Sequence, residues 1–413
     1  MSLTYKQIWD RYSHVEFIRR LYIKRLQTGG TYESDWVEIS QGQTKDGSVN
    51  SISRTLPNNS WQFGFVTVSN VSLEVLSPYQ EFASENDPNS IFFGYIRHKS
   101  KLKVVDAFID KYTDPAVPVE ASVTTFEGYI DATTAQTEQG YEKCTVLDYM
   151  AALDDVNVAE LSLVQTTLNA LIYEILNRSI FTKFFNVSSS TDYINAGYNI
   201  SSIDITKYTG SVLEMIQDLA KGHSIFYIDP TDSYFYFKPA DPTATTQYSF
   251  LESNNRKIDI SSWREGIDRQ VTNWYWDEED AGISAIASPA PVNTISEKFK
   301  IDGVANSIQR QNVLNYILTR TQYAKPYFKL VLPYFPVIKL LDRVSVQSFG
   351  SAPKDALRWG MFSWTSQLTT NPNTAPRWRK PAGIRISADD EWMVRSINHS
   401  NNLQTTIELE KIL

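Results

Sequence analysis

The side chains that could do chemistry in this 413-residue chain are few and widely spaced. Its four histidines are spread along the sequence: His14, His98, His223 and His399. A zinc-binding helix needs two histidines separated by three residues, and the sequence has no such pair. We therefore expect the histidines to lie at the surface or in an interface between proteins, and we expect no metal site built from them.

Carboxylates suggest two further kinds of site. The acidic run at 277–280 (Asp-Glu-Glu-Asp) follows Trp-Tyr-Trp at 274–276, and calcium binds several carboxylates at once. The run lacks the alternating spacing and the turn glycine of a calcium-binding loop, so we expect solvated charges, with a cation site as the alternative. Glycoside cleavage needs two carboxylates about 5–10 Å apart. Candidates for that role are Glu127, Asp131 and Asp268.

Motifs for phosphate binding and for nucleophilic catalysis are absent from the sequence. Gly29-Gly30 is not followed by Gly-Lys-Ser/Thr, and no Gly-x-Ser-x-Gly motif occurs. The one cysteine, Cys144, excludes an intrachain disulfide and a multi-cysteine zinc site, and we expect it to be a small buried side chain. We therefore predict no catalytic residue, no cofactor and no metal, and a protein that is not an enzyme.

The composition is that of a globular protein with an acidic balance. The chain is 42% hydrophobic and 21% charged, with a net charge of −8. No apolar run reaches the roughly 18 residues of a membrane span, and the first residues lack the apolar segment of a signal peptide. Binding of nucleic acid needs a surplus of Lys and Arg to neutralise the phosphates, so we expect no specific nucleic-acid binding. Aromatic residues make up 13%, which favours sheet faces and protein interfaces, although sugar-binding platforms use aromatic rings too.

The last segment of the chain predicts a β-hairpin. Its hydrophobic positions alternate with polar ones, a period of two that buries one face of a strand, and Asn401-Asn402 supplies the turn. A similar strand–turn–strand pattern occurs at 126–147. We expect the alternating residues to form the core of a barrel, with a neighbouring strand whose first residues lie at the barrel mouth. The residues concerned are Leu403, Thr405, Ile407 and Leu409 in the hairpin, Leu341 and Val344 in the neighbouring strand, and Asp342 and Arg343 at the mouth.

Between these β units the hydrophobic period changes to that of helices. The pattern predicts helices at 163–178 and 304–323, the second with Ile308 and Val313 among its inward residues. A further helix begins at Ser211, which forms a capping box with Glu214, and ends at Gly222. A hairpin of 224–228 and 234–238 follows it. Other segments predicted from the sequence are a leading helix at 4–12 and strands at 15–26, 35–40, 64–68, 71–76, 91–98, 101–108, 122–134, 141–147, 271–276, 327–332, 342–347, 359–368 and 383–387.

The order of these elements predicts a β-rich α+β fold with two barrel-like tube domains. The first barrel domain covers 1–152, and 153–247 forms helices and a helix-hairpin module. An irregular region with strand pieces and a long helix covers 248–326. The second barrel domain covers 327–413, and strands from 263–276 are able to join it.

In this arrangement the chain resembles the baseplate hub, or tail-tip hub, proteins of tailed bacteriophages and related injection systems. The resemblance covers most of the chain in order, and each of its motifs is short. It implies two tube domains per chain, so that a homotrimer presents six similar barrels in a ring. Four segments carry it: 126–131 with 144–148, 212–229 with 234–239, 340–346, and 392–400 with 405–409.

The resemblance implies a structural virion protein, assembled in the host cytoplasm, that adapts a sixfold tail tube to a threefold tip and conducts DNA during ejection. The implied partners are a tail tube or distal tail protein, a tape measure protein, and a separate tip, spike or fibre protein. DNA is expected to pass the lumen without specific binding. The alternative is a receptor-binding or glycan-binding or -degrading tail protein, for which aromatic residues and carboxylates are the basis. A third reading is a β-rich adhesion or secretion component unrelated to phages.

Overall fold

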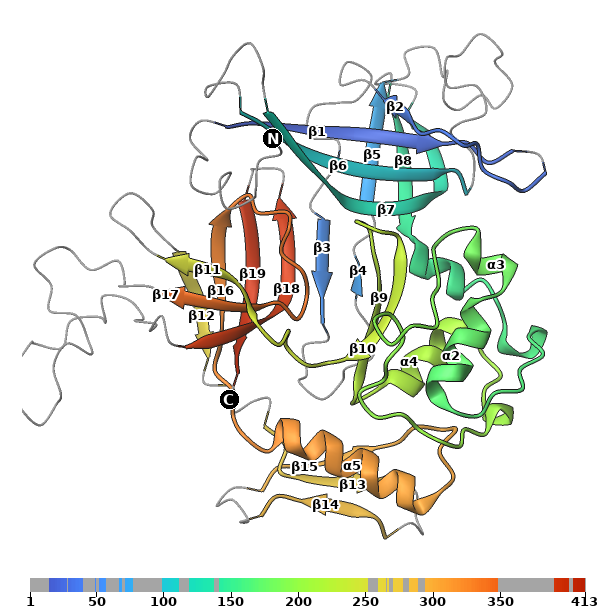
Figure 1. The fold of residues 1–413 in the computed structure, drawn as a ribbon, viewed down its shortest axis with the longest axis vertical. Coiled ribbons are helices and arrows are strands. Elements are labelled where there is room, and N and C mark those ends of the chain that lie inside the picture. Colours follow the sequence, from blue (N-terminus) through green and yellow to red (C-terminus); the bar gives the residue numbers. More distant parts are fainter. Residues whose placement is uncertain are drawn as a thin grey trace, which may run out of the picture.

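The computed structural model arranges the chain as two large β-sheets, a helical module and a small helix-and-sheet unit (Figure 1). The β-rich α+β class predicted from the sequence is confirmed. Several predicted features lie outside the described residues: the helix at 4–12, the strands at 91–98, 359–368 and 383–387, and the turn at 401–402. The structure describes residues 15–27, 29–39, 49, 52–56, 67–68, 71–76, 99–110, 119–136, 141–251, 259–264, 266, 270–277, 282–288, 294–347, 390–400 and 404–412.

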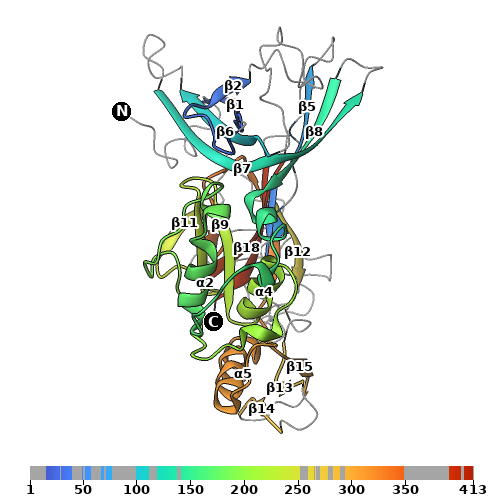
Figure 2. The ribbon, with the colours of Figure 1, turned by 90° about the vertical axis from the view of Figure 1, so that its right-hand side faces the viewer.

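An antiparallel sheet of six strands lies at one end of the molecule, in the order β2-β1-β6-β7-β8-β5. The long central strand β7 pairs with β6 through its first part and with β8 through its second. Figure 2 shows that the sheet curls around β7, with β1 and β6 on one side and β5 and β8 on the other. The strands agree with the predicted segments: β1 (Val15–Lys24), β2 (Val37–Ile39), β5 (Val71–Leu76), β6 (Lys101–Asp110), β7 (Val119–Gln136) and β8 (Tyr141–Asp148).

Alternation along the strands gives this sheet one apolar face. In β6 the buried Leu102 and Val104 alternate with half-buried lysines, as the period of a strand requires. The apolar side chains of neighbouring strands meet on this face in a core that includes Phe126 and Cys144. Cys144 is free and buried there, as predicted.

The helical module follows β8 and packs α2 (Leu168–Leu176) and α4 (Val212–Ala220) against a hairpin. The capping box at the start of α4 is confirmed, because Ser211 and Glu214 each bond the other's backbone amide. Gly222 ends the helix at φ +78°, where Ile317 packs so closely that a Cβ would clash. The remaining elements are η3 (Tyr149–Leu153), η4 (Val158–Glu160), α3 (Ser179–Thr182), η5 (Ile205–Lys207), β9 (Ser224–Asp229) and β10 (Tyr234–Pro239).

The helix predicted at 163–178 begins later than expected. Its first turn is replaced by an extended segment in which the backbone amides of Val164 and Gln165 donate to the carboxylate of Glu174. Val164, which the predicted helix would have placed among its buried apolar residues, is 75% exposed. A hydrophobic period does not reveal that a side chain ten residues further on satisfies these amides instead of a helical turn.

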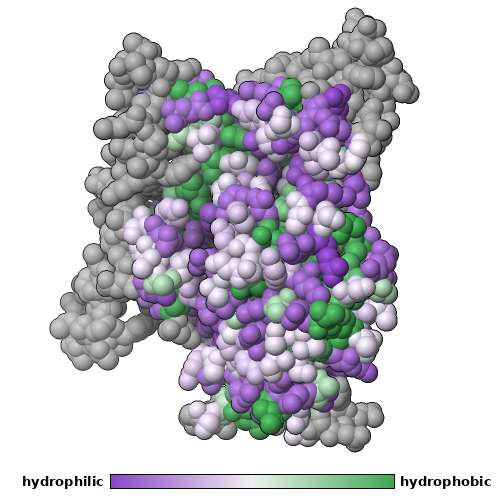
Figure 3. Space-filling model, turned by 45° about the vertical axis from the view of Figure 1, so that its right-hand side comes forward, coloured by the Kyte–Doolittle hydropathy of each residue, from purple (hydrophilic) through white to green (hydrophobic). Residues whose placement is uncertain are grey.

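The small unit consists of α5 (Ser307–Thr321) on a three-stranded sheet of β14 (Ser284–Ile286), β13 (Asn273–Trp276) and β15 (Ser296–Phe299). Asn306 caps α5 by accepting from the amides of Ile308 and Gln309. Ile308 is 69% exposed, so its predicted inward position was wrong, whereas Val313 is buried as predicted. In Figure 3 the exposed hydrophobic side chains form separate patches among polar ones.

The second large sheet gathers strands from distant parts of the chain. Its order is β11-β17-β18-β19-β16-β12, and β3, from the N-terminal part, pairs with β18. Of the interval 263–276, residues Trp263 and Arg264 end β12 in this sheet, while Asn273–Trp276 forms β13 in the three-stranded sheet. The strands are β3 (Ile52–Thr55), β4 (Thr67–Val68), β11 (Thr246–Leu251), β12 (Asp259–Arg264), β16 (Tyr327–Pro333), β17 (Arg343–Gln347), β18 (Glu391–Ser400) and β19 (Gln404–Lys411).

A buried polar cluster joins the two large sheets. Arg19 on β1 and Asp106 on β6 are cross-strand partners, and Arg19 Nε lies 2.7 Å from Asp106 Oδ1. Tyr334, just after β16, donates its hydroxyl to Asp106 and accepts from Arg19 Nη2 at 2.8 Å. Its ring lies 4.8 Å from Phe17 and 6.2 Å from Phe108 between ring centroids. We call Arg19, Asp106 and Tyr334 the inter-sheet clamp.

Two neighbouring arginines provide a matched test of this clamp. The Asp106 side chain is fully buried, so Asp106→Asn leaves the Arg19 charge without a carboxylate and is expected to lower the free energy of unfolding by about 3 kcal/mol. Glu120→Gln breaks the exposed pair of Arg20 and Glu120 and is expected to cost less than about 1 kcal/mol. Urea unfolding measures both. Equal losses in the two variants would show that the clamp adds nothing beyond a surface ion pair.

Candidate functional site

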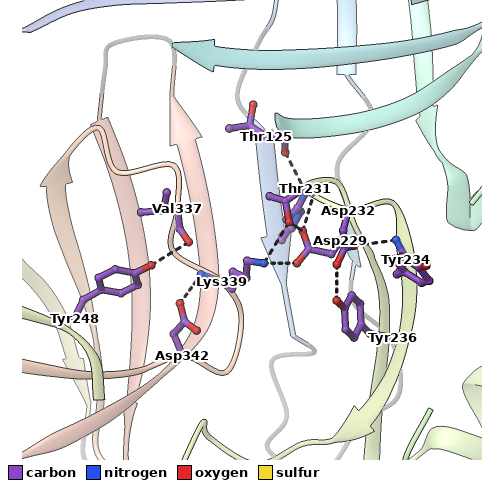
Figure 4. Close-up of polar contacts among 11 residues, drawn as sticks. Thr125, Asp229, Thr231, Asp232, Tyr234, Tyr236, Tyr248, Val337, Lys339 and Asp342 are labelled. Carbon is purple, nitrogen blue, oxygen red and sulfur yellow. Dashed lines mark hydrogen bonds and ion pairs between the residues drawn. The ribbon is translucent and has the colours of Figure 1, made fainter. Parts of the chain in front are cut away.

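The second contact between the modules lies where the β9–β10 hairpin meets the loop before β17 (Figure 4). The hairpin turns at 230–233, and Asp229 is the last residue of β9 before this turn. Its carboxylate accepts from the backbone amide of Thr231 at 2.9 Å and from the hydroxyl of Thr231 at 2.6 Å. Asp232 accepts from the hydroxyl of Tyr236 at 2.6 Å. These local bonds fix the turn and aim the Asp229 carboxylate at the neighbouring module.

Lys339 links this turn to the eight-stranded sheet. Its Nζ lies 2.6 Å from Asp229 Oδ2 and 3.3 Å from the hydroxyl of Thr231. Its backbone amide donates to Asp342 Oδ2 at 2.8 Å, which ties the lysine to the loop before β17. We call Asp229, Lys339 and Asp342 the hairpin junction. It holds the helical module and the C-terminal sheet in one orientation.

The backbone beside the junction is in an uncommon conformation. Leu341 has φ +67°, although it is not a glycine, and its side chain is 6% exposed. Its amide donates to Val394 O, and the amide of Val394 donates to Asp342 O, so the kink is held by β18 on both sides. A left-handed leucine costs free energy and persists where its surroundings determine it, which marks this kink as a fixed structural point.

The two carboxyls of the junction respond to their surroundings in opposite directions. Burial raises the pKa of Asp342 to about 6, against hydrogen bonding and attraction from Lys339, with Asp229 adding repulsion. Burial acts to raise the pKa of Asp229 as well, but Lys339 and the bonds from Thr231 outweigh it, so that pKa is lowered. Lys339 is therefore paired with Asp229, and Asp342 is the weaker acid of the two.

The structure places the predicted barrel residues around this junction. Arg343 begins β17 and pairs with Glu391 at 2.9 Å across to β18, next to the buried Val344. Thr405, fully buried on β19, accepts from the amide of Phe335 at 2.7 Å. Ile407 and Leu409 lie fully buried in the core of this sheet, and Leu403 lies outside the described residues.

Among the described residues, those predicted as alternatives for chemistry do not converge. Glu127 is half-buried and accepts from the hydroxyl of Ser233, while Asp131 is exposed and Asp268 lies outside the described residues. Asp277 is exposed and pairs with Lys298 at 2.9 Å, and the rest of the 277–280 run is not described. Within the described ranges, no group of three or more His, Cys, Asp or Glu side chains could hold a metal ion. No helix among these residues is long and apolar enough to cross a membrane.

The prediction that the histidines lie at a surface or interface was wrong for the two that the structure describes. His223 is fully buried beside Ser224, with Nδ1 2.7 Å from its hydroxyl, and His399 is 6% exposed with Nδ1 3.1 Å from the hydroxyl of Thr405. Burial lowers the pKa of each to about 3, so both are neutral core residues. His14 and His98 lie outside the described part of the chain.

The aromatic stretches lie mainly in the core. Trp274 and Trp276 are buried under α5, and alternate residues of β10, Phe235 and Phe237, are fully buried. Tyr236 is half-buried on the other face of the hairpin, where its ring lies 5.3 Å from that of Tyr227. The period of a strand thus divides this aromatic run between a core face and an outer face.

Sequence reasoning missed the residues that join the modules. Asp106 and Arg19 sit at inward positions of their strands, in step with the buried Phe108 and Leu21. A charged residue in an otherwise apolar alternation is a signal that could have identified each of them. Their third partner, Tyr334, and the pair of Asp229 with Lys339 leave no comparable signal, because their partners lie far away in the sequence.

Solved structures similar to this chain include tail proteins. No family model and no curated protein matches the sequence. The tail protein from Neisseria meningitidis MC58 is 11% identical, with a TM-score of 0.48 over 95% of this chain and 96% of that chain. The prophage MuSo2 43 kDa tail protein from Shewanella oneidensis is 12% identical, with a TM-score of 0.48 over 96% of this chain and 98% of that chain. The prophage tail protein gp18 from Listeria monocytogenes EGD-e is 10% identical, with a TM-score of 0.46 over 95% and 94%.

The structural similarity to these tail proteins extends over nearly the full length of the chain.

The hairpin junction predicts a defined pH dependence of stability. The pKa of Asp342 is raised in the folded state, so its contribution is fully present below about pH 4 and is lost as the pH rises through about 6. Asp342→Asn stays neutral and should gain stability relative to the wild type between pH 4 and 7, on the order of 2 kcal/mol. Urea unfolding at several pH values measures this.

Asp229→Asn is the matched control for this experiment. The pKa of Asp229 is lowered in the folded state, so its contribution is present at neutral pH and lost as the pH falls. This variant should therefore lose stability at pH 7 and change less at low pH. If Asp342→Asn instead loses stability at pH 7 as Asp229→Asn does, Asp342 is not the weaker acid of the two.

Proposed function

We propose that this chain is a structural component of a phage tail or a related injection system, located in the virion, and that it acts as a hub subunit. In this role a homotrimer joins a sixfold tail tube to a threefold tip and conducts DNA during ejection. The observation that supports the proposal is that one chain contains two large β-sheets, one of them curled, each with its own apolar core, held together by the inter-sheet clamp.

Two β units per chain provide a physical way to match symmetries. Three copies of the chain present six β units, and contacts that join unlike surfaces of neighbouring copies close into a ring. For such a ring, the two units of a chain must keep a fixed separation and angle. A buried clamp of Arg19, Asp106 and Tyr334, with β3 crossing from the N-terminal part to pair with β18, provides that rigidity.

The proposed tube domains keep the predicted boundaries, 1–152 for the first and 327–413 for the second, with the modules at 153–247 and 248–326 between them. To these the second domain adds β3 and β4 from the N-terminal part and β11 and β12 from the middle of the chain. In the second domain Thr405, Ile407 and Leu409 contribute to the barrel core, together with Leu341 and Val344. Asp342 and Arg343 lie at the mouth of that barrel, where the ion pair of Arg343 with Glu391 closes one end of the strand pair.

The proposed partners are a tail tube or distal tail protein, a tape measure protein, and a tip, spike or fibre protein on another chain. The net charge of −8 suits a lumen through which DNA slides, because an acidic wall does not retain phosphates. The alternative of a receptor-binding or glycan-degrading tail protein has less support. In the aromatic stretches at 234–237 and 274–276, every second ring is buried, namely Phe235, Phe237, Trp274 and Trp276, so these four rings cannot form a sugar platform.

Mass measurement in solution tests the hub proposal. The purified chain, studied by light scattering after size exclusion over a range of concentrations, should reach three times its 47.1 kDa mass. Averaged electron-microscope images of that species should contain a ring of six similar densities. A strict monomer at every concentration, or a dimer with twofold symmetry, would contradict the proposal.

A further inference from the structure

The face of the six-stranded sheet opposite its apolar core carries a stripe of basic and aromatic side chains. We call Tyr22, Lys24, Trp36 and Lys103 the basic–aromatic stripe. Tyr22 and Lys24 lie on β1, Lys103 lies on β6 directly opposite Tyr22, and Trp36 immediately precedes β2 at the sheet edge. All four side chains are half-buried.

The rings of the stripe hold its ammonium groups in place. Lys103 Nζ lies 4.6 Å from the centroid of the Trp36 ring and 5.1 Å from that of Tyr22, and Lys24 Nζ lies 5.5 Å from the Trp36 centroid. One tryptophan ring thus orients both lysines through cation–π contacts. Long flexible side chains that are oriented before binding lose less entropy when a ligand arrives.

The described contacts of the two ammonium groups are with aromatic rings. Among the described residues, neither Lys24 nor Lys103 forms an ion pair or donates a hydrogen bond. Their neighbour Arg20, by contrast, pairs with Glu120 at 2.5 Å. Glu127, the partner of Lys103 on β7, accepts from the hydroxyl of Ser233 and attracts both lysines. Each ammonium carries three donors, so a carboxylate of a partner can accept from it.

The electrostatics of the stripe favour an incoming anion. Burial lowers the pKa of Lys103, Glu127 opposes this, and the nearby charge of Lys24 lowers it further. Two like charges held on one ring repel each other, and a carboxylate placed between them relieves that repulsion.

We propose that the basic–aromatic stripe binds an acidic segment of a partner protein, whose carboxylates pair with Lys24 and Lys103 while its aliphatic stems cover the Trp36 ring. The surroundings favour an acidic peptide over a nucleic acid. Glu38 and Glu120 flank the stripe with side chains 49% and 36% exposed, and the chain as a whole is acidic, so a continuous row of phosphates is repelled. A short segment with a pair of carboxylates fits between these flanking charges.

Binding of a fluorescent Gly/Ser decapeptide with two adjacent glutamates at its centre to the full-length protein at low salt tests this proposal. The wild type should bind this glutamate peptide with an affinity that falls as salt is added, and should bind the same peptide with two glutamines far more weakly. The double variant Lys24→Glu/Lys103→Glu should bind the glutamate peptide about tenfold more weakly. The matched control is Lys207→Glu/Lys329→Glu, which reverses two exposed lysines on other elements and should stay within about twofold of the wild type.

Three further readouts complete the test. Lys24→Gln/Lys103→Gln, which adds no repulsion, should also weaken binding and guards against misfolding of the reversed variant, with circular dichroism as a check on both. Equal losses in the control and the stripe variants, or no binding of the glutamate peptide by the wild type, would overturn the proposal. Inorganic polyphosphate that binds more tightly than the peptide, and depends on Lys24 and Lys103, would overturn the choice of an acidic protein segment. The outcome is independent of whether the protein forms a trimer.

Discussion

The buried clamp of Arg19, Asp106 and Tyr334 is the interaction on which the rest of the structure depends. It joins β1 and β6 of one large sheet to the segment that follows β16 of the other. An ion pair removed from water gains little net stability, because desolvation offsets the attraction. Its effect is geometric, since a planar guanidinium and a tyrosine hydroxyl that share one carboxylate allow few relative positions. The Phe17 ring meets Tyr334 edge-on, the Phe108 ring lies tilted against it, and together they exclude water from the contact.

Other polar contacts also fix the relative positions of neighbouring modules. Arg54 on β3 donates to the carbonyl of Thr125 on β7 at 3.0 Å, while Thr55 contacts Ser396 on β18 at 3.1 Å, so one short strand touches both sheets. The pair of Lys339 with Asp229 joins the helical module to the same region. Polar groups therefore occupy these boundaries. The two large sheets keep separate apolar cores and directional bonds set their relative orientation, whereas the helical module and the small helix-and-sheet unit share one core.

Local features were predictable from the sequence because their partners lie nearby. The capping box of Ser211 and Glu214 joins residues three apart, and the alternation of Thr405, Ile407 and Leu409 follows from strand geometry. The first turn of the helix at 163–178 was not predictable, because Glu174 captures the amides of the preceding loop. The inter-sheet clamp and the hairpin junction were not predictable either, because their partners are even further apart in the sequence. Asp106 lies 228 positions from Tyr334, and Asp229 lies 110 positions from Lys339.

A clamp that fixes the two large sheets relative to each other makes them move and open as one body. Hydrogen exchange of the intact chain, followed by mass spectrometry, measures this most directly, because it gives the opening free energy of each strand separately. If the clamp couples the sheets, amides of β6 and β19 should exchange with the same opening free energy, equal to that of global unfolding. If β6 exchanges through an opening that leaves β19 protected, the two sheets are independent and the account is wrong.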